Sequence, residues 1–159
     1  MILSWIKKRM LNWCSAQRCR IVLLDPGAKL PALGTMHAAG YDLSSIERVT
    51  LPPRGRELVR TGLAAAIPKG FHLEIRPRSG LALHHGITVL NAPGTIDADY
   101  RGELKVILFN TTDAPYTIEP GERIAQALLM RQQTITWEVV PSLDETTRGT
   151  SGFGSTGMG

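Results

Sequence analysis

Proline and glycine interrupt this sequence so frequently that long helices are excluded from most of it. Ten prolines recur at short intervals from Pro26 to Pro141, and 16 glycines lie among and after them. Both residues favour turns, and proline also lacks a backbone donor, so the intervening segments should be short. Those segments are rich in β-branched and other apolar residues and comprise residues 21–24, 58–61, 63–67, 71–75, 104–109, 116–118, 124–130 and 135–140. The pattern predicts an all-β sandwich or barrel.

Only one helix is predicted, a turn or two over residues 79–85, which follow Pro77. Residues 106–109 and 125–130 are apolar almost throughout, which indicates strands that are buried on both faces. A small sandwich has few such strands, so we expect a subunit interface there. Residues 134–140 alternate polar and apolar side chains and could pair with a neighbouring subunit.

The net charge of +4 belongs to the N-terminus. Residues 1–20 contain five basic side chains and no acid, whereas the remainder is close to neutral. The charge is therefore poor evidence for a nucleic-acid-binding face, and we expect no stable nucleic-acid binding. No apolar segment approaches the roughly 20 residues that span a bilayer. We expect one β domain over residues 21–147, with residues 1–20 outside its core and residues 148–159 as a flexible flap.

The basic, amphipathic segment over residues 1–14 allows three interpretations. It could dock on a membrane, act as a targeting peptide, or be an inert extension. It is short and lacks a small-residue cleavage site, so we favour the inert extension and expect no membrane contact. Both cysteines, Cys14 and Cys19, lie near this end and leave the body without a disulfide. That distribution fits a reducing compartment such as the cytoplasm.

The last eleven residues cannot build a core, because five are glycine and only Phe153 and Met158 are large and apolar. Their closely spaced amides can form an anion-binding nest, to which Arg148 adds a planar cation and Ser155 and Thr156 add hydroxyls. The segment is either a flap over a phosphorylated, ring-bearing ligand or a disordered terminus. Its Gly-x-Gly-x-x-Gly pattern is not a dinucleotide site, because no helix can follow it.

Several internal positions combine polar side chains with turns or apolar surroundings. Asp42 lies among apolar residues and needs hydrogen-bonding partners or contact with a metal-bound water. Arg78, Ser79 and Gly80 lie where a short helix begins, which suits an anion, although capping by Ser79 and a salt bridge from Arg78 would also explain them. Gln126, inside an apolar strand, is either a satisfied core amide or a ligand contact.

The longest polar turn, residues 91–102, is predicted to form the lip of a hairpin. Its backbone amides and Asn91 could read the donor and acceptor edge of a pyrimidine. Asp97 has apolar neighbours in the sequence, a setting that favours a general base. Asp99 is better explained as a turn residue, whereas Tyr100 could pack under a sugar and exclude a 2′-hydroxyl.

Taken in order, five segments resemble the five motifs of the trimeric deoxyuridine triphosphatase (dUTPase) family. They are Ala39-Gly-Tyr-Asp-Leu, Pro77-Arg-Ser-Gly-Leu-Ala, Gly94-Thr-Ile-Asp-Ala-Asp-Tyr-Arg-Gly, Arg123-Ile-Ala-Gln and Arg148-Gly-Thr-Ser-Gly-Phe-Gly-Ser-Thr-Gly. The resemblance covers residues 21–159 and implies a jelly-roll-like β subunit and a homotrimer with three shared active sites. The implied reaction is hydrolysis of dUTP to dUMP and pyrophosphate, which limits uracil incorporation into DNA and supplies dUMP for dTMP synthesis.

The resemblance also implies a role for each matching residue. Asp97 would deprotonate the water that attacks the α-phosphorus, without a covalent intermediate, and Ser79 would lie near the α–β bridging oxygen. Tyr100 would lie against the deoxyribose. Uracil would be read by Asn91, by the backbone of Thr95, Ile96 and Asp97, and by the backbone of Lys105, and covered by Phe153. The phosphates would be contacted by Arg78, Gly80, Gln126, Arg148, Gly154, Ser155 and Thr156.

The same resemblance implies that Mg²⁺ is bound through the triphosphate, with Asp42 touching it only through water. Two rival functions are less consistent with the sequence. A dCTP deaminase of the same superfamily would place its base and water at the pyrimidine ring, and would lack the Asp97 motif together with the Phe153 tail. A non-catalytic trimer that binds dUTP and regulates partners would not need an intact base and flap.

Overall fold

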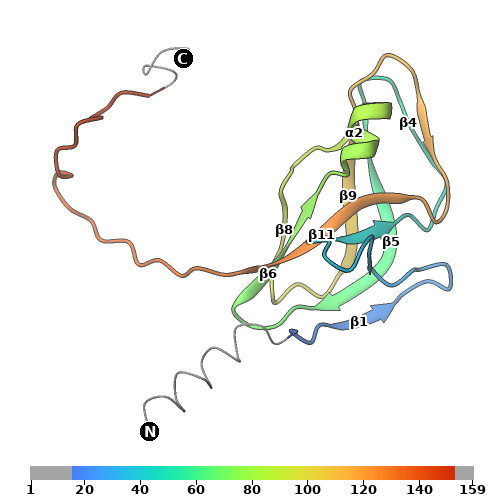
Figure 1. Cartoon of the computed structure of the whole chain (residues 1–159), viewed down its shortest axis with the longest axis horizontal. Helices are drawn as coiled ribbons and strands as arrows, with labels where there is room; N and C mark the ends of the chain where they lie inside the picture. Colours follow the sequence, from blue (N-terminus) through green and yellow to red (C-terminus); the bar gives the residue numbers. More distant parts are fainter. Residues whose placement is uncertain (1–15, 153–159) are drawn as a thin grey trace, which may run out of the picture.

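The computed structural model describes residues 16–152, whose regular secondary structure is almost entirely β-strand (Figure 1). The strands are β1 (Arg20–Leu23), β2 (Ala32–Leu33), β3 (Tyr41–Ser44), β4 (Val49–Leu51), β5 (Arg56–Ala66), β6 (Phe71–Arg76), β7 (Ile87–Val89), β8 (Gly94–Ile96), β9 (Glu103–Asn110), β10 (Tyr116–Ile118) and β11 (Arg123–Arg131). The one helix assigned within these residues is α2 (Ser79–His85). The all-β prediction is confirmed.

Two main antiparallel sheets pack around a common core. One has the strand order β1-β5-β9-β7, and the other has the order β2-β3-β11-β6-β8. A third sheet contains only β10 and β4. The chain passes repeatedly from one main sheet to the other, as expected of a jelly-roll-like architecture.

The core lies between the main sheets. Val59 on β5 and Leu108 on β9 are completely buried and meet Leu43 and Ile124 of the opposite sheet in one apolar cluster. Along β9, buried residues alternate with less buried ones, so only one face of this strand is fully covered within the chain. The outward apolar residues of β9 and β11 are half-buried, which differs from the predicted burial on both faces.

Strand β5 is one continuous strand where two were predicted, over residues 58–61 and 63–67. It continues through Gly62, which has a φ of 68°. The register between β5 and β9 shifts between Arg60 and Ala64. Because glycine adopts positive φ without a Cβ clash, Gly62 bends the strand at a bulge without ending it.

The helix α2 forms over the predicted residues. Arg78 precedes it in an extended conformation, and no side chain caps its first turn. Simple N-capping by Ser79 is therefore excluded, and Ser79 is exposed at the first position of the helix. The helix ends at Gly86, whose left-handed φ of 65° lets its amide donate to the carbonyl of Ala82.

After β11, residues 132–152 lead away from the body as the orange and red segment of Figure 1. This segment, which we call the C-terminal arm, has no assigned strand, so the strand predicted over 135–140 is absent from the single chain. Trp137 and Val139 of the arm are 85% and 99% exposed. Among residues 16–152, no helix has the length and apolar character to cross a membrane.

Candidate active site

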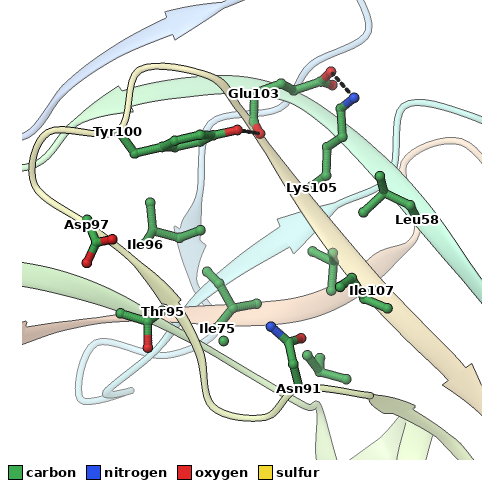
Figure 2. Close-up of a pocket in the computed structure, with 13 residues that line it drawn as sticks. Leu58, Ile75, Asn91, Thr95, Ile96, Asp97, Tyr100, Glu103, Lys105 and Ile107 are labelled. Atoms are coloured by element: carbon green, nitrogen blue, oxygen red, sulfur yellow. Dashed lines mark hydrogen bonds and ion pairs between the residues drawn. The ribbon is translucent and has the colours of Figure 1, made fainter.

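A cleft of about 450 Å³ opens beside the turn between β8 and β9 (Figure 2). Residues from both main sheets line it. The apolar part of the lining is formed by Leu58, Ile75, Val89, Ile96, Val106 and Ile107, and the polar part by Asn91, Thr95, Asp97, Tyr100, Glu103 and Lys105. Six of the seven residues that the sequence assigned to uracil, sugar and the attacking water are therefore brought together: Asn91, Thr95, Ile96, Asp97, Tyr100 and Lys105. The seventh, Phe153, lies outside the described residues.

The turn that carries Asp97 connects the two main sheets. Strand β8 pairs with β6, whereas β9 pairs with β5 and β7. The predicted hairpin is therefore wrong, because β8 forms its ladder with β6 and β9 does not pair with it. The crossing from one sheet to the other places Asp97 and Tyr100 at the mouth of the cleft (Figure 2).

Asn91 lies against the start of β8, and its amide points into the cleft in Figure 2. A Cβ at Gly94 would lie 3.2 Å from the Asn91 Nδ2 and 3.4 Å from the Ile75 Cβ. Glycine at position 94 therefore lets the Asn91 side chain approach the β8 backbone closely.

Asp97 is exposed in the single chain, so the apolar setting inferred from its sequence neighbours is not found there. The backbone amide of Tyr100 donates to the carbonyl of Asp97 across 3.2 Å and closes a tight turn. This turn also contains Asp99, which does not line the main cleft. Asp97 stands at the edge of the cleft with its carboxylate free for a water molecule.

Glu103, which no sequence pattern pointed to, centres a charged network at the rim of the cleft. Its carboxylate accepts two hydrogen bonds from the Arg60 Nε, at 3.2 and 3.1 Å, and one from the Gly62 amide at 2.9 Å. The Lys105 Nζ lies 3.8 Å from the same carboxylate. The hydrogen bond and charge of Glu103 raise the pKa of Arg60 above its usual value. In the sequence, Glu103 is only a charged residue at the start of a predicted strand, and such a residue does not by itself indicate a network of ion pairs.

A second polar group surrounds Asp42, where β3 and β11 meet the start of α2. The Arg78 Nε donates to the Asp42 Oδ1 at 3.1 Å, and the Arg123 Nη1 donates to the Oδ2 at 2.9 Å. Arg78 also donates to the carbonyl of Arg123 at 3.0 Å. Asp42 therefore has two cationic partners, and Ser79 and Gly80 are exposed beside them.

Gln126 joins this group from β11. Its Nε2 donates to the carbonyl of Pro77 at 2.9 Å, and a Cβ at Gly40 would overlap its Oε1. Glycine at position 40 thus makes room for the Gln126 side chain. The group defined by Asp42, Arg78, Ser79, Gly80 and Gln126 is called the α2 group below; no member of it lines the main cleft.

The remaining predicted contacts belong to the C-terminal arm and the residues after it. Arg148 is exposed, and its Nε donates to the carbonyl of Ser151 at 2.9 Å. Phe153, Gly154, Ser155 and Thr156 lie outside the described residues. Within residues 16–152, no three His, Cys, Asp or Glu side chains gather as a metal-binding group.

Comparisons with known proteins agree on one family. The family model for dUTPase matches residues 27–157. The deoxyuridine 5'-triphosphate nucleotidohydrolase of Wolinella succinogenes is 54% identical over 140 residues, which are 88% of this chain and 94% of that protein. A solved structure of the Staphylococcus bacteriophage 80alpha dUTPase with dUPNHPP matches with a TM-score of 0.82 at 28% identity, covering 90% of this chain and all of that one.

A mutant dUTPase from phage phi11 of S. aureus, described with a structural Mg(II) ion, matches with a TM-score of 0.73. Its identity is 23% and it covers 81% of this chain and all of that one, so this likeness supports the fold alone. The family match and the relative at 54% identity cover most of the chain. The chain belongs to the dUTPase family.

Proposed function

We propose that this enzyme hydrolyses dUTP to dUMP and pyrophosphate, with the cleft of Figure 2 as its nucleoside site. The observation that carries the proposal is the convergence of Asn91, Asp97 and Tyr100 on one cleft with an apolar floor. A volume of about 450 Å³ lies in the range of small-molecule sites. The activity would limit uracil incorporation into DNA and supply dUMP for dTMP synthesis.

In this proposal, uracil enters the cleft with its polar edge toward the strand backbone. The amide of Asn91 and the backbone of residues 95–97 and Lys105 offer both donors and acceptors to that edge. Ile75 and Ile107 supply apolar contact to the faces of the ring. The Tyr100 ring lies against the deoxyribose and occupies the space that a 2′-hydroxyl would need.

Asp97 acts as the general base. Its carboxylate takes a proton from a water molecule, and the resulting nucleophile attacks the α-phosphorus while pyrophosphate leaves. Positioned general-base catalysis of this kind contributes about 10²–10⁴-fold to a rate. No side chain becomes covalently bound, because the attacking oxygen comes from water.

The α2 group binds the phosphates. Ser79 offers a hydroxyl near the α–β bridging oxygen, while Arg78, Gly80 and Gln126 contact phosphate oxygens. Hydrolysis of a triphosphate depends on neutralising and positioning charge rather than on covalent chemistry. Asp42 orients Arg78 for this purpose through the 3.1 Å contact between Oδ1 and Nε.

Because the α2 group does not line the cleft, we infer that a complete site needs more than one subunit. A homotrimer with shared sites satisfies this requirement. The half-buried apolar faces of β9 and β11 and the exposed C-terminal arm provide surfaces for such an assembly. The arm would carry Arg148, Phe153, Gly154, Ser155 and Thr156 to a neighbouring site, where Phe153 covers uracil and the others contact the β- and γ-phosphates.

Mixing two inactive variants tests whether sites are shared. Subunits with Asp97→Asn and subunits with Arg78→Ala are unfolded together and refolded, and sedimentation is expected to give three times the 17.4-kDa chain mass. If each site draws these residues from different subunits, some sites in the mixed assembly contain both native residues and hydrolysis returns. A mixture that stays inactive although it assembles contradicts shared sites.

Mg²⁺ accompanies the triphosphate in this proposal. Both carboxylate oxygens of Asp42 already accept hydrogen bonds from arginines, which suits a contact through water better than direct ligation. Bound to the phosphates, the ion would offset negative charge during hydrolysis. The free thiol of Cys19 fits the reducing cytoplasm as the site of action, although residues 1–20 leave targeting open.

The proposed reaction is tested by offering dUTP, UTP, dTTP and dCTP separately with Mg²⁺ and measuring pyrophosphate and ammonia. Pyrophosphate released at the highest kcat/KM from dUTP, without ammonia, is the expected result. Ammonia from dCTP would instead identify a deaminase. Binding of dUTP without turnover would identify a non-catalytic trimer, and either outcome overturns the proposal.

A further inference from the structure

Gly102 leaves the space in which the Tyr100 ring lies. A Cβ at position 102 would overlap the Tyr100 hydroxyl oxygen and would lie 2.6 Å from Cζ and 3.0 Å from Cε2. Atoms cannot approach this closely, so any side chain here must displace the ring. Gly102 itself lies between Arg101 and Glu103, directly beside the nucleoside cleft.

The glycine is required for space and not for its backbone conformation. The glycines with positive φ in the described residues are Gly62, Gly70, Gly86, Gly121 and Gly149, and Gly102 is not among them. Alanine can therefore adopt the backbone conformation of residue 102 without strain. A substitution to alanine would act through the clash with Tyr100.

The backbone around Tyr100 is held more firmly than its side chain. The Arg101 Nη1 donates to the carbonyls of Ala98 and Tyr100, both at 2.7 Å, and the Tyr100 amide donates to the Asp97 carbonyl at 3.2 Å. The half-exposed ring is held at its far end by one hydrogen bond, from the Tyr100 hydroxyl to the Glu103 carbonyl at 3.1 Å. Figure 2 shows the ring extended along this contact. The ring is thus the part that would move.

We propose that Gly102 is a positioning residue for sugar selectivity: it seats the Tyr100 ring where that ring excludes a ribose 2′-hydroxyl. The inference rests on the proposed function, in which Tyr100 lies against the deoxyribose. With alanine at position 102, the ring leaves its seat and the hydrogen bond to Glu103 is lost. The space beside C2′ then opens, and UTP is accepted more readily relative to dUTP.

The test compares kcat/KM for dUTP and for UTP in the assembled enzyme. In Gly102→Ala, the dUTP/UTP ratio is expected to fall by about tenfold or more, because the site loses a steric barrier. Gly34→Ala is the matched control, since a Cβ at Gly34 would make only an ordinary contact of 4.0 Å with the Asp42 Oδ2. The dUTP/UTP ratio of kcat/KM in Gly34→Ala should equal that of the unaltered enzyme.

A second comparison shows whether Gly102→Ala changes sugar selectivity through the Tyr100 ring or by disturbing the site in general. In a Tyr100→Ala background, Gly102→Ala should leave the ratio nearly unchanged, because contacting residues that act as one unit are non-additive. Tyr100→Phe removes only the hydrogen bond to the Glu103 carbonyl, so it should lower the dUTP/UTP ratio of kcat/KM by a smaller factor. This variant provides a test in case Gly102→Ala does not fold.

The inference is overturned if Gly102→Ala keeps the original ratio, or if it lowers the ratio equally in both backgrounds. Should Gly102→Ala fail to fold, an unchanged ratio in Tyr100→Phe overturns it. If the unaltered enzyme does not hydrolyse dUTP, the proposed function fails first, and this outcome is distinct from a change of selectivity.

Discussion

Asp42 and Arg78 form an ion pair, with 3.1 Å between Oδ1 and Nε, that fixes the arginine at the start of α2. Arg123 occupies the other carboxylate oxygen at 2.9 Å. The carboxylate therefore holds two guanidinium groups side by side, where their like charges would otherwise drive them apart. Through Asp42 on β3 and Arg123 on β11, this network connects the two strands to Arg78, directly before Ser79 and Gly80 of α2.

Replacing this carboxylate with a neutral amide should weaken phosphate binding. In Asp42→Asn, Arg78 loses its fixed orientation, so we expect kcat/KM for dUTP to fall by about tenfold, mainly through KM. The free energy of unfolding should fall by about 1–2 kcal/mol, since Asp42 is mostly buried and its hydrogen bonds are charge-assisted. Steady-state kinetics and urea unfolding measure the two effects.

Asp113→Asn is the matched control for Asp42→Asn. Asp113 also pairs with an arginine, Arg54, but its side chain is 84% exposed and lies outside both the cleft and the α2 group. Exposed ion pairs contribute little to stability, so this variant should behave like the unaltered enzyme. Equal kinetics in both variants would contradict the role of Asp42.

Removing residues 148–159 should abolish most activity while preserving the fold. Residues 148–151 are exposed, and their intramolecular hydrogen bonds join only one another and Thr146, so the melting temperature should change little. The loss of Arg148, Phe153 and the hydroxyls that follow leaves the nucleotide uncovered, and kcat/KM for dUTP should fall by about 100-fold or more.

Deleting residues 1–15 is the corresponding control at the other terminus. If the N-terminal segment is an inert extension, this variant keeps its kcat/KM and its melting temperature. A truncation of residues 148–159 that still hydrolyses dUTP at the normal rate would instead show that these residues do not serve as a flap.

Tyr116 should be the source of a tyrosine titration at high pH. Partial burial and the hydrogen bond to the Glu122 carboxylate, at 2.6 Å, raise the pKa of Tyr116 to about 12. Its pKa in the unfolded chain is near 10. The folded state therefore holds the proton more tightly, and the stabilisation present below pH 10 is lost as the pH rises toward 12.

An ultraviolet titration of tyrosinate measures this directly. A component with a pKa of about 12 should be present in the native enzyme and absent from Tyr116→Phe, whose stability should also fall less steeply over that pH range. If the titration of the native enzyme is unchanged by Tyr116→Phe, the assignment is wrong.

The sequence predicted the long elements well because each carries its own local signal. The helix over 79–85 and the short strand over residues 116–118 occur as predicted. Strand β6 extends beyond its predicted range by one residue at its C-terminal end, and β9 and β11 extend by one residue at each end. Proline and glycine residues near the ends of these elements made their boundaries predictable. By contrast β2, β3, β4, β7 and β8, which contain only two to four residues each, were missed; among the described strands of this length, β1 and β10 were predicted because apolar β-forming residues dominate them.

Six residues that line the cleft were named from the sequence, but the geometry that brings them together was not predicted. The sequence places Asn91 and Tyr100 on one turn. The pairing of β8 with β6, however, joins segments that are distant in sequence, and no local pattern predicts it. The separation of the α2 group from the cleft likewise depends on the whole fold. Glu103 was missed because its significance arises from Arg60 and Gly62, which are distant in sequence.

The most direct measurement is single-turnover hydrolysis by Asp97→Asn beside calorimetric binding of a non-hydrolysable dUTP analogue. We expect binding close to that of the unaltered enzyme and a rate lower by about 10²–10⁴-fold, because the amide cannot accept the proton of the attacking water. A near-normal rate of dUTP hydrolysis in this variant would contradict the assignment of Asp97 as the base.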